Sequence, residues 1–471
     1  MSSAGRRLQR PLAANRVKTY ETQGPANGDK DLKRCGGEDE DRTHDLCIAN
    51  AALSQLSYPP HKGSSLATKA AASKIIDNLP MLSNTALQLA QTLIRMNTVS
   101  QNSNLELIHF VRDELSRLGV RSRLSYNADK TKANLFATLG EGRSSGVILS
   151  GHTDTVPWDG QDWSMPPLGA EVRDAPEPRL YGRGSADMKG YIGVALAQAQ
   201  TFLTGPTPCA VHLALSYDEE VGCFGVRELI ADMRDAGIKP LACIIGEPTG
   251  MVPAIAHKGV YRYRCCVRGK EAHSSLTPTS VNAIEMAARL IGKLRDMAEG
   301  FERSEPRYAG FDVPFSTACV GQFQGGIADN VVPRDAWFHY EFRDLPTADA
   351  RRMQQEMLAH ARALEQSMQA IAPQTGFQFN TICEIPSFLG SADDAVTRLA
   401  QRLSGQSRPT QVAFGTEAGI FKQSGIQTVV CGPGHITQAH QPDEFVSLDQ
   451  LAQCERFMQR LAATPAEELL A

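Results

Sequence analysis

The chain has 471 residues, of which 48 are Lys or Arg and 52 are Asp or Glu, so its formal net charge is −4. This near balance gives no basic footprint for nucleic acid and no polybasic patch for a membrane surface. No apolar run approaches the ~20 residues that span a bilayer, and the length predicts two or more folded units.

The cysteines indicate a reducing compartment. There are 11 of them, an odd number, and no Cys-x-x-Cys pair occurs. This usage favours free thiols in a soluble, cytoplasmic protein over a disulfide framework. Four cysteines lie among apolar residues and are predicted to be small members of the core: Cys209, Cys243, Cys319 and Cys431.

Residues 1–80 differ from the rest of the chain. Residues 1–34 are rich in Arg, Lys, Asn, Gly and Pro and lack periodicity, which predicts disorder. No apolar stretch follows Arg6-Arg7, as a signal peptide would require. The run from Gly36 to Pro60 resembles a peptide translated by mistake from a transfer-RNA gene. We therefore expect an over-extended start, with the natural protein beginning between Leu66 and Met81; the alternative is a genuine disordered tail.

Residues 81–258 alternate between helical and strand patterns. Ser83 is predicted to cap a helix that ends near Arg95. Apolar residues recur with helical spacing over 103–118, which predicts a second helix. Its apolar face is Leu105, Ile108, Val111, Leu115 and Leu118. The other predicted elements are strands at 134–139, 147–150, 210–217 and 241–246, and helices at 189–203 and 222–235. This alternation predicts an α/β fold with a mostly parallel sheet flanked by helices.

The pattern changes at residue 259. Up to residue 386 the predicted order is strand, helix, two strands, helix, strand, which is the ferredoxin-like arrangement. The predicted ranges are 260–267, 281–297, 315–323, 335–343, 348–371 and 377–385. Residues 387–471 then return to the first pattern, with helices at 393–403 and 448–462 and a strand at 428–431. We therefore expect 259–386 to be a domain inserted into a catalytic domain made of 81–258 and 387–471.

Seven ionisable residues stand just past predicted strand ends or in the turns beside them: His152, Asp154, Asp187, Glu219, Glu220, Glu247 and His440. Any one of them alone is better explained as a solvated loop charge. Together at one edge of a sheet, so many carboxylates would repel one another unless metal ions compensated them. Imidazole and carboxylate ligands without thiolates suit zinc, cobalt or manganese. One bridging carboxylate with two ligands on each side would make a site for two metals ~3.5–4 Å apart.

The neighbours Glu219 and Glu220 fit this interpretation. Side chains of adjacent residues diverge, so one carboxylate can bind a metal while the other faces the water as general base.

Seven ordered motifs carry a resemblance to a known family. They are Gly-His152-Thr-Asp154-Thr-Val-Pro, Gly-Ser-Ala-Asp187-Met-Lys-Gly, Asp-Glu219-Glu220-Val-Gly, Gly-Glu247-Pro-Thr, Gly-Lys-Glu-Ala-His273-Ser-Ser, Gly-Gly-Ile-Ala-Asp-Asn330-Val-Val-Pro and Ala-His440-Gln-Pro-Asp-Glu. In this order they resemble the dinuclear-zinc amidohydrolases and peptidases, the family of acetylornithine deacetylase and succinyl-diaminopimelate desuccinylase. The resemblance runs from about Leu82 to the C-terminus and implies a zinc-peptidase-like fold with an inserted lid and dimerisation domain.

The resemblance also implies residue roles. One metal would be bound by His152 and Glu247 and the other by Glu220 and His440, with Asp187 bridging them. Asp154 would orient His152, and Glu219 would be the general base. The family further implies a cis peptide bond between Asp187 and Met188.

Three residues of the inserted domain complete the implied site. His273 would stabilise the oxyanion, commonly from the partner subunit of a homodimer. Asn330 and Arg343 fall at the positions that bind the substrate carboxylate, for which a guanidinium fork is well suited.

The implied reaction is metal-dependent hydrolysis of N-acetyl-L-ornithine to L-ornithine and acetate, a step of arginine biosynthesis, with two divalent ions, zinc or cobalt. Gly432-Pro-Gly434 and Gly415-Thr-Glu-Ala418 favour the acetylornithine deacetylase branch. The alternatives are a desuccinylase or another N-acyl-amino-acid hydrolase with the same metals, and a relative used only for binding or regulation. A retained Glu219 argues against the last. The implied partner is a small-molecule substrate, with no nucleic acid and no membrane.

Four further residues were weighed and set aside. His212 is predicted to be a core residue of its strand, and His257 to mark the entry into the inserted domain. His435 receives no ligand role from the resemblance. Glu417 could anchor a substrate ammonium group, but its motif assigns it no role.

Overall fold

The computed structural model describes residues 81–140, 144–174, 176–205 and 209–469. The expectation of an over-extended start falls on residues 1–80, which lie outside the described residues.

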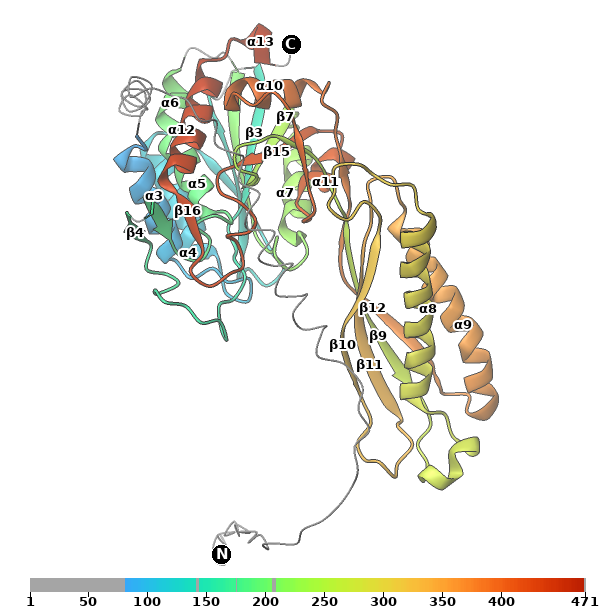
Figure 1. Cartoon of the computed structure of the whole chain (residues 1–471). Helices are drawn as coiled ribbons and strands as arrows, with labels where there is room; N and C mark the ends of the chain where they lie inside the picture. Colours follow the sequence, from blue (N-terminus) through green and yellow to red (C-terminus); the bar gives the residue numbers. More distant parts are fainter. Residues whose placement is uncertain (1–80, 141–143, 175, 206–208, 470–471) are drawn as a thin grey trace, which may run out of the picture. The chain divides into compact units, whose positions relative to one another are not determined.

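A nine-stranded sheet forms the larger part of the structure (Figure 1). Its order is β1-β2-β6-β3-β7-β15-β8-β13, and β14 also pairs with β8. The four central strands β6, β3, β7 and β15 are parallel, while β1 and β2 add antiparallel pairs at one edge. The strands are β1 Ser122–Tyr126, β2 Ala133–Leu139, β3 Ser144–His152, β6 Cys209–Ser216, β7 Ala242–Pro248, β8 Ala254–His257, β13 Phe388–Leu389, β14 Thr410–Val412 and β15 Gln427–Gly432. The predicted α/β class with a mostly parallel sheet is confirmed.

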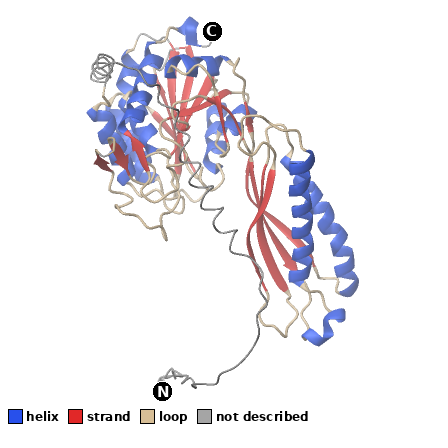
Figure 2. Cartoon of the chain, in the orientation of Figure 1, coloured by secondary structure: helices blue, strands red, loops and turns tan. Residues whose placement is uncertain are grey.

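Helices cover both faces of this sheet (Figure 2). Successive strand residues point to opposite faces, so Leu149 and Ile244 join one apolar cluster while Ile148 and Ile245 join the other. The first cluster packs against α3 Asn84–Arg95, α4 Leu105–Arg117, α5 Lys189–Ala197, α6 Ala199–Thr204, α10 Ala395–Ser404, α12 Leu448–Ala463 and α13 Ala466–Leu469, and the second against α7 Phe224–Asp235 and α11 Ala418–Gln423. Burial on both faces explains why the central strands are continuously apolar in sequence.

A second sheet is antiparallel and is formed by the segment predicted to be inserted. Its order is β10-β11-β9-β12, and along the chain the elements alternate as predicted for a ferredoxin-like unit. The elements are β9 Val260–Arg268, the 3-10 helix η1 Ser274–Thr279, α8 Ala283–Ser304, β10 Thr317–Gly325, β11 Asp335–Arg343, α9 Ala350–Ile371 and β12 Gly376–Ile385. α8 and α9 pack on one face of the sheet, which gives β9 and β11 their alternating burial.

A third, three-stranded sheet joins distant parts of the chain. It consists of β4 Glu171–Arg173, β5 Arg179–Tyr181 and β16 Phe445–Ser447, in the order β16-β5-β4. Tyr181 pairs with Phe445, so the loop after β5 is held next to the loop before β16.

The structure corrects several details of the sequence-based prediction. Leu118 was placed on the buried face of its helix but is 37% exposed, because the helix ends at Arg117 and Gly119 adopts φ 76°. Cys319 was predicted to be buried and is exposed, because it lies on β10, an edge strand of a sheet that α8 and α9 cover on one face. Cys243 and Cys431 are buried as predicted. The predicted helix 189–203 is divided at Gln198 into α5 and α6.

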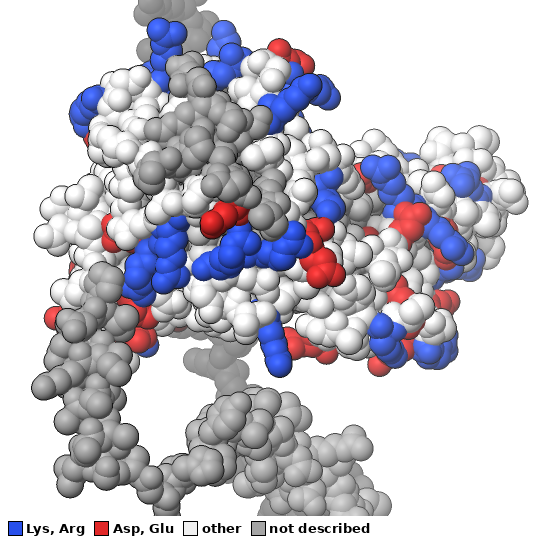
Figure 3. Space-filling view, turned by 90° about the horizontal axis from the view of Figure 1, so that it is seen from above, with Lys and Arg blue, Asp and Glu red and all other residues white. Residues whose placement is uncertain are grey.

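The charged surface agrees with the composition. On the face shown in Figure 3, Lys and Arg side chains lie close to Asp and Glu side chains, as their near-equal totals lead one to expect. Within the described ranges, no helix has the length and apolar character that crossing a bilayer requires.

Gly193 permits the close approach of α5 to α3. A β-carbon at this position would lie 2.5 Å from the backbone nitrogen of Ala90 and 2.6 Å from its Cα. We expect Gly193→Ala to lower the free energy of unfolding by about 1–3 kcal/mol, because the two helices would have to separate. Urea unfolding of purified protein measures this change.

Gly292 in α8 provides the matched control. It is exposed, and no atom lies within 4 Å of a β-carbon placed there. Gly292→Ala should therefore raise stability by up to about 1 kcal/mol through helix propensity alone. Equal effects of the two substitutions would contradict the tight α3–α5 contact.

Candidate active site

Metal-capable side chains converge at the carboxyl edge of the parallel strands, where ligands collect in open α/β sheets. β3 ends at His152, and Glu247 is the penultimate residue of β7. His152 is aligned with Ser216 at the end of β6, which brings the following Glu219–Glu220 turn to the same edge. Asp187 precedes α5, and His440 lies in the connection from β15 to β16.

Two groups of possible metal ligands form there and share one residue. His152, Asp187 and Glu247 make the first group, and Asp187, Glu220 and His440 the second; in each, the ligand atoms lie within 4.8 Å of one another. The sequence placed these five residues around two metals, and the structure brings all five together.

The carboxylate of Asp187 faces both groups at once. Its Oδ1 lies 2.8 Å from Nε2 of His152, and its Oδ2 lies 3.3 Å from Nε2 of His440. The remaining carboxylates flank it, with Glu247 3.6 Å from His152 and Glu220 3.1 Å from His440. This is the arrangement that a carboxylate bridging two ions requires.

The charges of the cluster call for compensation by cations. Burial raises the pKa of Glu219, Glu220 and Glu247, and neighbouring carboxylates raise each of them further. Burial lowers the pKa of His152, but Glu247 and Asp187 raise it well above its ordinary value overall. Carboxylates crowded in this way repel one another, and divalent ions between them would remove the repulsion. The donor set of imidazole and carboxylate therefore fits a pair of divalent metals.

Asp154 contacts the imidazole of His152 through its backbone carbonyl. Nδ1 of His152 lies 3.0 Å from the backbone carbonyl of Asp154 and 3.7 Å from its carboxylate. The backbone thus orients the ring and leaves Nε2 facing Asp187. The carboxylate of Asp154 instead accepts hydrogen bonds from the backbone nitrogens of Glu219 (3.1 Å) and Glu220 (3.3 Å) and from Ser100 Oγ (2.7 Å). Sequence reasoning missed Ser100, because no motif marks it.

The three site residues predicted in segment 259–386 make their contacts within that segment. His273 is exposed, caps η1, and its Nδ1 accepts a hydrogen bond from the Ser275 backbone nitrogen. It pairs with Val331, so Asn330 is close to it. Arg343, at the end of β11, donates to Glu341. Among the described residues of this single chain, no recorded hydrogen bond or ion pair joins these three to the metal-ligand groups.

The cis peptide bond implied by the family occurs between Asp187 and Met188.

Two histidines without a predicted role lie outside the two metal-ligand groups. His212 is buried in β6, stacked on Phe136, and burial lowers its pKa to about 4. His257 ends β8, directly before the second sheet begins.

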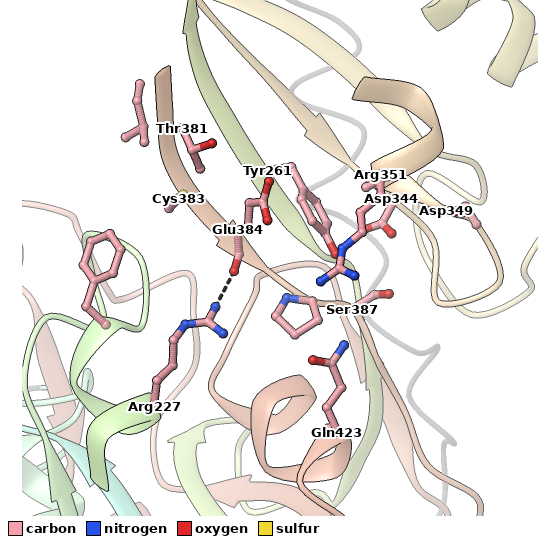
Figure 4. A pocket seen from close by; sticks show the side chains of 15 residues that line it. Arg227, Tyr261, Asp344, Asp349, Arg351, Thr381, Cys383, Glu384, Ser387 and Gln423 are labelled. Carbon is pink, nitrogen blue, oxygen red and sulfur yellow. Dashed lines mark hydrogen bonds between the residues drawn. The ribbon is translucent and has the colours of Figure 1, made fainter. Parts of the chain in front are cut away.

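A cavity of about 610 Å³ lies apart from this cluster. Figure 4 shows Arg227 extending from α7 toward Glu384 of β12, where its guanidinium donates to the backbone carbonyl. None of the ten predicted site residues lines this cavity. We therefore assign no part of the predicted reaction to it.

A comparison with family models matches residues 148–464 to peptidase family M20/M25/M40. The matched range contains every residue of the two metal-ligand groups. The chain belongs to this family.

Curated relatives point to one branch of it. The acetylornithine deacetylase of Myxococcus xanthus is 34% identical over 82% of this chain and 98% of its own length. The acetylornithine deacetylase of Pasteurella multocida (strain Pm70) is 33% identical over 80% of this chain and 96% of its own length. The resemblance inferred from the motifs is thus confirmed, and the protein is a hydrolase of the M20/M25/M40 family.

Solved structures share the fold. An M20 family metallo-carboxypeptidase from Sulfolobus solfataricus superposes with a TM-score of 0.65 at 17% identity, covering 81% of this chain and 99% of that one. The YXEP protein of Bacillus subtilis, described as a dinuclear metal binding peptidase of the M20 family, gives 0.52 at 16% identity and covers 84% and 98%.

Glu417 is buried and is held by serines of β6 and β3 near the ends of these strands. Its carboxylate accepts hydrogen bonds from Ser216 Oγ and Ser150 Oγ, and it is 1% exposed. Burial raises its pKa to about 7, against the lowering effect of the Ser216 hydrogen bond. A carboxyl with a raised pKa stabilises the fold at low pH and loses that contribution as the pH rises through its folded pKa.

Glu417→Gln should therefore stabilise the metal-stripped protein at alkaline pH. Near pH 8, where wild-type Glu417 is ionised and buried, the variant should gain about 1–3 kcal/mol in free energy of unfolding. Near pH 5 the folded wild-type carboxyl is neutral and only the unfolded one is partly ionised, so the gain should be much smaller. Urea unfolding at both pH values measures the difference; a gain of the same size at both would contradict the buried ionisation.

Proposed function

We propose that the protein is a two-metal amide hydrolase that converts N-acetyl-L-ornithine and water to L-ornithine and acetate. The shared carboxylate of Asp187, with one oxygen toward His152 and the other toward His440, is the observation that carries the metal chemistry. The curated relatives that match at 31–34% identity are acetylornithine deacetylases, and they support the choice of substrate. The reaction would be a step of arginine biosynthesis.

The proposed ligands are His152 and Glu247 for one ion and Glu220 and His440 for the other, with Asp187 common to both. Divalent ions held there, zinc or cobalt, supply Lewis-acid polarisation of an amide carbonyl and acidify water. His152 is preset for this use, because its Nδ1 is engaged by the Asp154 carbonyl and its Nε2 is turned toward Asp187.

Glu219 is the proposed general base. It is 8% exposed at the metal edge, and its backbone is fixed by the Asp154 carboxylate. In the proposed reaction Glu219 accepts a proton from the attacking water, whose oxygen bonds to the acetyl carbon. The proton then passes to the ornithine nitrogen as the amide C–N bond breaks, which leaves acetate and a free amine.

The remaining residues would act on the substrate. We propose that Asn330 and Arg343 bind its carboxylate and that His273 stabilises the oxyanion. His273 is exposed on its own chain, which suits a role in the site of a second subunit. A homodimer in which segment 259–386 serves as lid and dimerisation domain is therefore part of this proposal.

The substrate assignment is tested by amine release from a panel of N-acetyl and N-succinyl amino acids with zinc or cobalt added. N-acetyl-L-ornithine should have the highest kcat/KM, by about 10-fold or more, because a pocket that binds its side-chain amine leaves groups unpaired with other substrates. A preference for N-succinyl substrates would keep the metal chemistry and reject the proposed substrate. No activity on any member, with two metals bound, would reject the hydrolase mechanism proposed for this site.

Glu219→Gln tests the general base. The amide keeps the size of the side chain but cannot accept the proton, so kcat should fall by about 10²–10⁴-fold while two equivalents of metal remain bound. Glu228→Gln is the control, since its exposed carboxylate accepts a hydrogen bond from Tyr217 away from the ligand groups. Near-full turnover by Glu219→Gln would refute the assignment.

A further inference from the structure

A buried ion pair lies next to the metal-ligand groups and belongs to neither of them. Arg183 follows β5 and Glu444 precedes β16, and the pairing of these two strands brings the residues together. Nη1 of Arg183 lies 2.7 Å from Oε2 of Glu444, and each residue is 1% exposed. Burying such a pair removes both charges from water, so stability alone is a weak reason for its presence.

The second oxygen of Glu444 holds the backbone that leads into Asp187. Oε1 accepts hydrogen bonds from the backbone nitrogens of Ala186 (3.0 Å) and Asp187 (3.1 Å). The position of the Asp187 main chain sets where its two carboxylate oxygens lie between His152 and His440. Glu444 therefore influences the geometry of both metal-ligand groups through Asp187, which belongs to both.

The guanidinium of Arg183 also connects Glu444 to the backbone of His440. Nη2 donates to Oε1 of Gln161 (2.6 Å), and Nε2 of Gln161 donates to the backbone carbonyl of His440 (2.9 Å). The face of the guanidinium also lies over the ring of Trp163, 5.0 Å from its centre. One buried cation thus ties the backbone of Asp187, through Glu444, to the backbone of His440, through Gln161.

We infer that Arg183 and Glu444 are positioning residues that fix the distance between Asp187 and His440 and thereby set the affinity for both metal ions together. The inference rests on the two-metal site proposed above and goes beyond it, because neither residue is a proposed ligand or catalytic group. Replacing a residue that hydrogen-bonds to a metal ligand and orients it typically lowers metal affinity 10–100-fold.

Glu444→Gln is the sharpest test. Among the described residues the partners of this carboxylate are donors: Arg183 Nη1 and the backbone nitrogens of Gly184, Ala186 and Asp187. The NH₂ of an amide must therefore face another donor, although the size of the side chain is unchanged. In the full-length protein, zinc and cobalt affinities are measured by competition with a chelator, and thermal unfolding of the metal-free protein is recorded alongside. We expect both equivalents to bind about 10–100-fold more weakly.

Glu455→Gln is the matched control. Glu455 is also buried and also accepts from donors only, Ser83 N (2.8 Å), Ser83 Oγ (2.6 Å) and Gln198 Nε2 (2.8 Å), but it joins α12 to α3 and the end of α5. Its replacement should lower thermal stability without changing metal affinity. An equal loss of metal affinity in both variants would show a general effect of destabilisation and overturn the inference.

Gln161→Ala provides a second variant in case Glu444→Gln does not fold. The Gln161 side chain donates to the His440 backbone carbonyl and accepts from Arg183 and from Trp163 Nε1, and none of these bonds is to Asp187. The Gln161→Ala variant should bind one metal equivalent about 10-fold more weakly, namely the equivalent whose binding His440→Ala removes. Its affinity for the other equivalent should be unchanged.

The outcomes separate this inference from the proposed function. The positioning role alone is overturned if the wild-type protein binds two equivalents of metal and Glu444→Gln binds them with unchanged affinity. If Glu444→Gln is unfolded, unchanged affinities in Gln161→Ala overturn it instead. Wild-type protein that binds fewer than two equivalents overturns the two-metal site and the positioning role with it.

Discussion

The structure around the site depends on how one carboxylate is held. Asp187 presents its two oxygens to imidazoles from distant parts of the chain, His152 and His440. A side chain can serve two groups only if its backbone is fixed, and here the fixing is done by hydrogen bonds from Ala186 and Asp187 to a buried acid. The parallel strands supply the platform, because their carboxyl ends bring His152, the Glu219–Glu220 turn and Glu247 to one edge.

The carboxylates near this edge divide into those that face the ligand groups and those that hold the backbone. Glu220, Glu247 and Asp187 contact the imidazoles. Asp154 and Glu444 instead accept backbone N–H groups, and each is also bound by a side chain, Ser100 or Arg183. These hydrogen bonds involve no metal, so the two acids can organise the backbone of the site before any ion arrives.

Much of this could be predicted from the sequence. Periodicity gave most long helices and the central strands within a few residues, although α8 runs seven residues past its predicted end at 297 and α11 was not predicted. The capping role of Ser83 is confirmed by its hydrogen bond from the Ala86 nitrogen. Strands of two to four residues, such as β13 and β8, were missed because so short a run has no measurable period. The burial of Cys319 was wrong because apolar neighbours do not reveal which face of a sheet is covered.

The ligand residues could be named in advance because the resemblance assigns them roles. The contacts of their supports could not, although Glu444 is the last residue of the motif that contains His440. Arg183 and Glu444 are 261 positions apart and pair only through the register of β5 and β16. Ser100 reaches Asp154 from a loop that carries no pattern of its own. Such contacts are decided by tertiary packing, which spacing along a chain does not encode.

The return of the chain to the first sheet has a consequence for biosynthesis. His152, Asp187, Glu219, Glu220 and Glu247 are all made before the second sheet, and His440 follows only after roughly 190 further residues, or roughly 10–40 s at ribosomal speed. During that interval the nascent chain carries an acidic edge that lacks one imidazole and also lacks β16, the strand that pairs with the already synthesised β5. A ribosome that stops before residue 440 would therefore release a chain that contains every residue of the first ligand group but lacks both His440 of the second group and Glu444, which holds the Asp187 backbone.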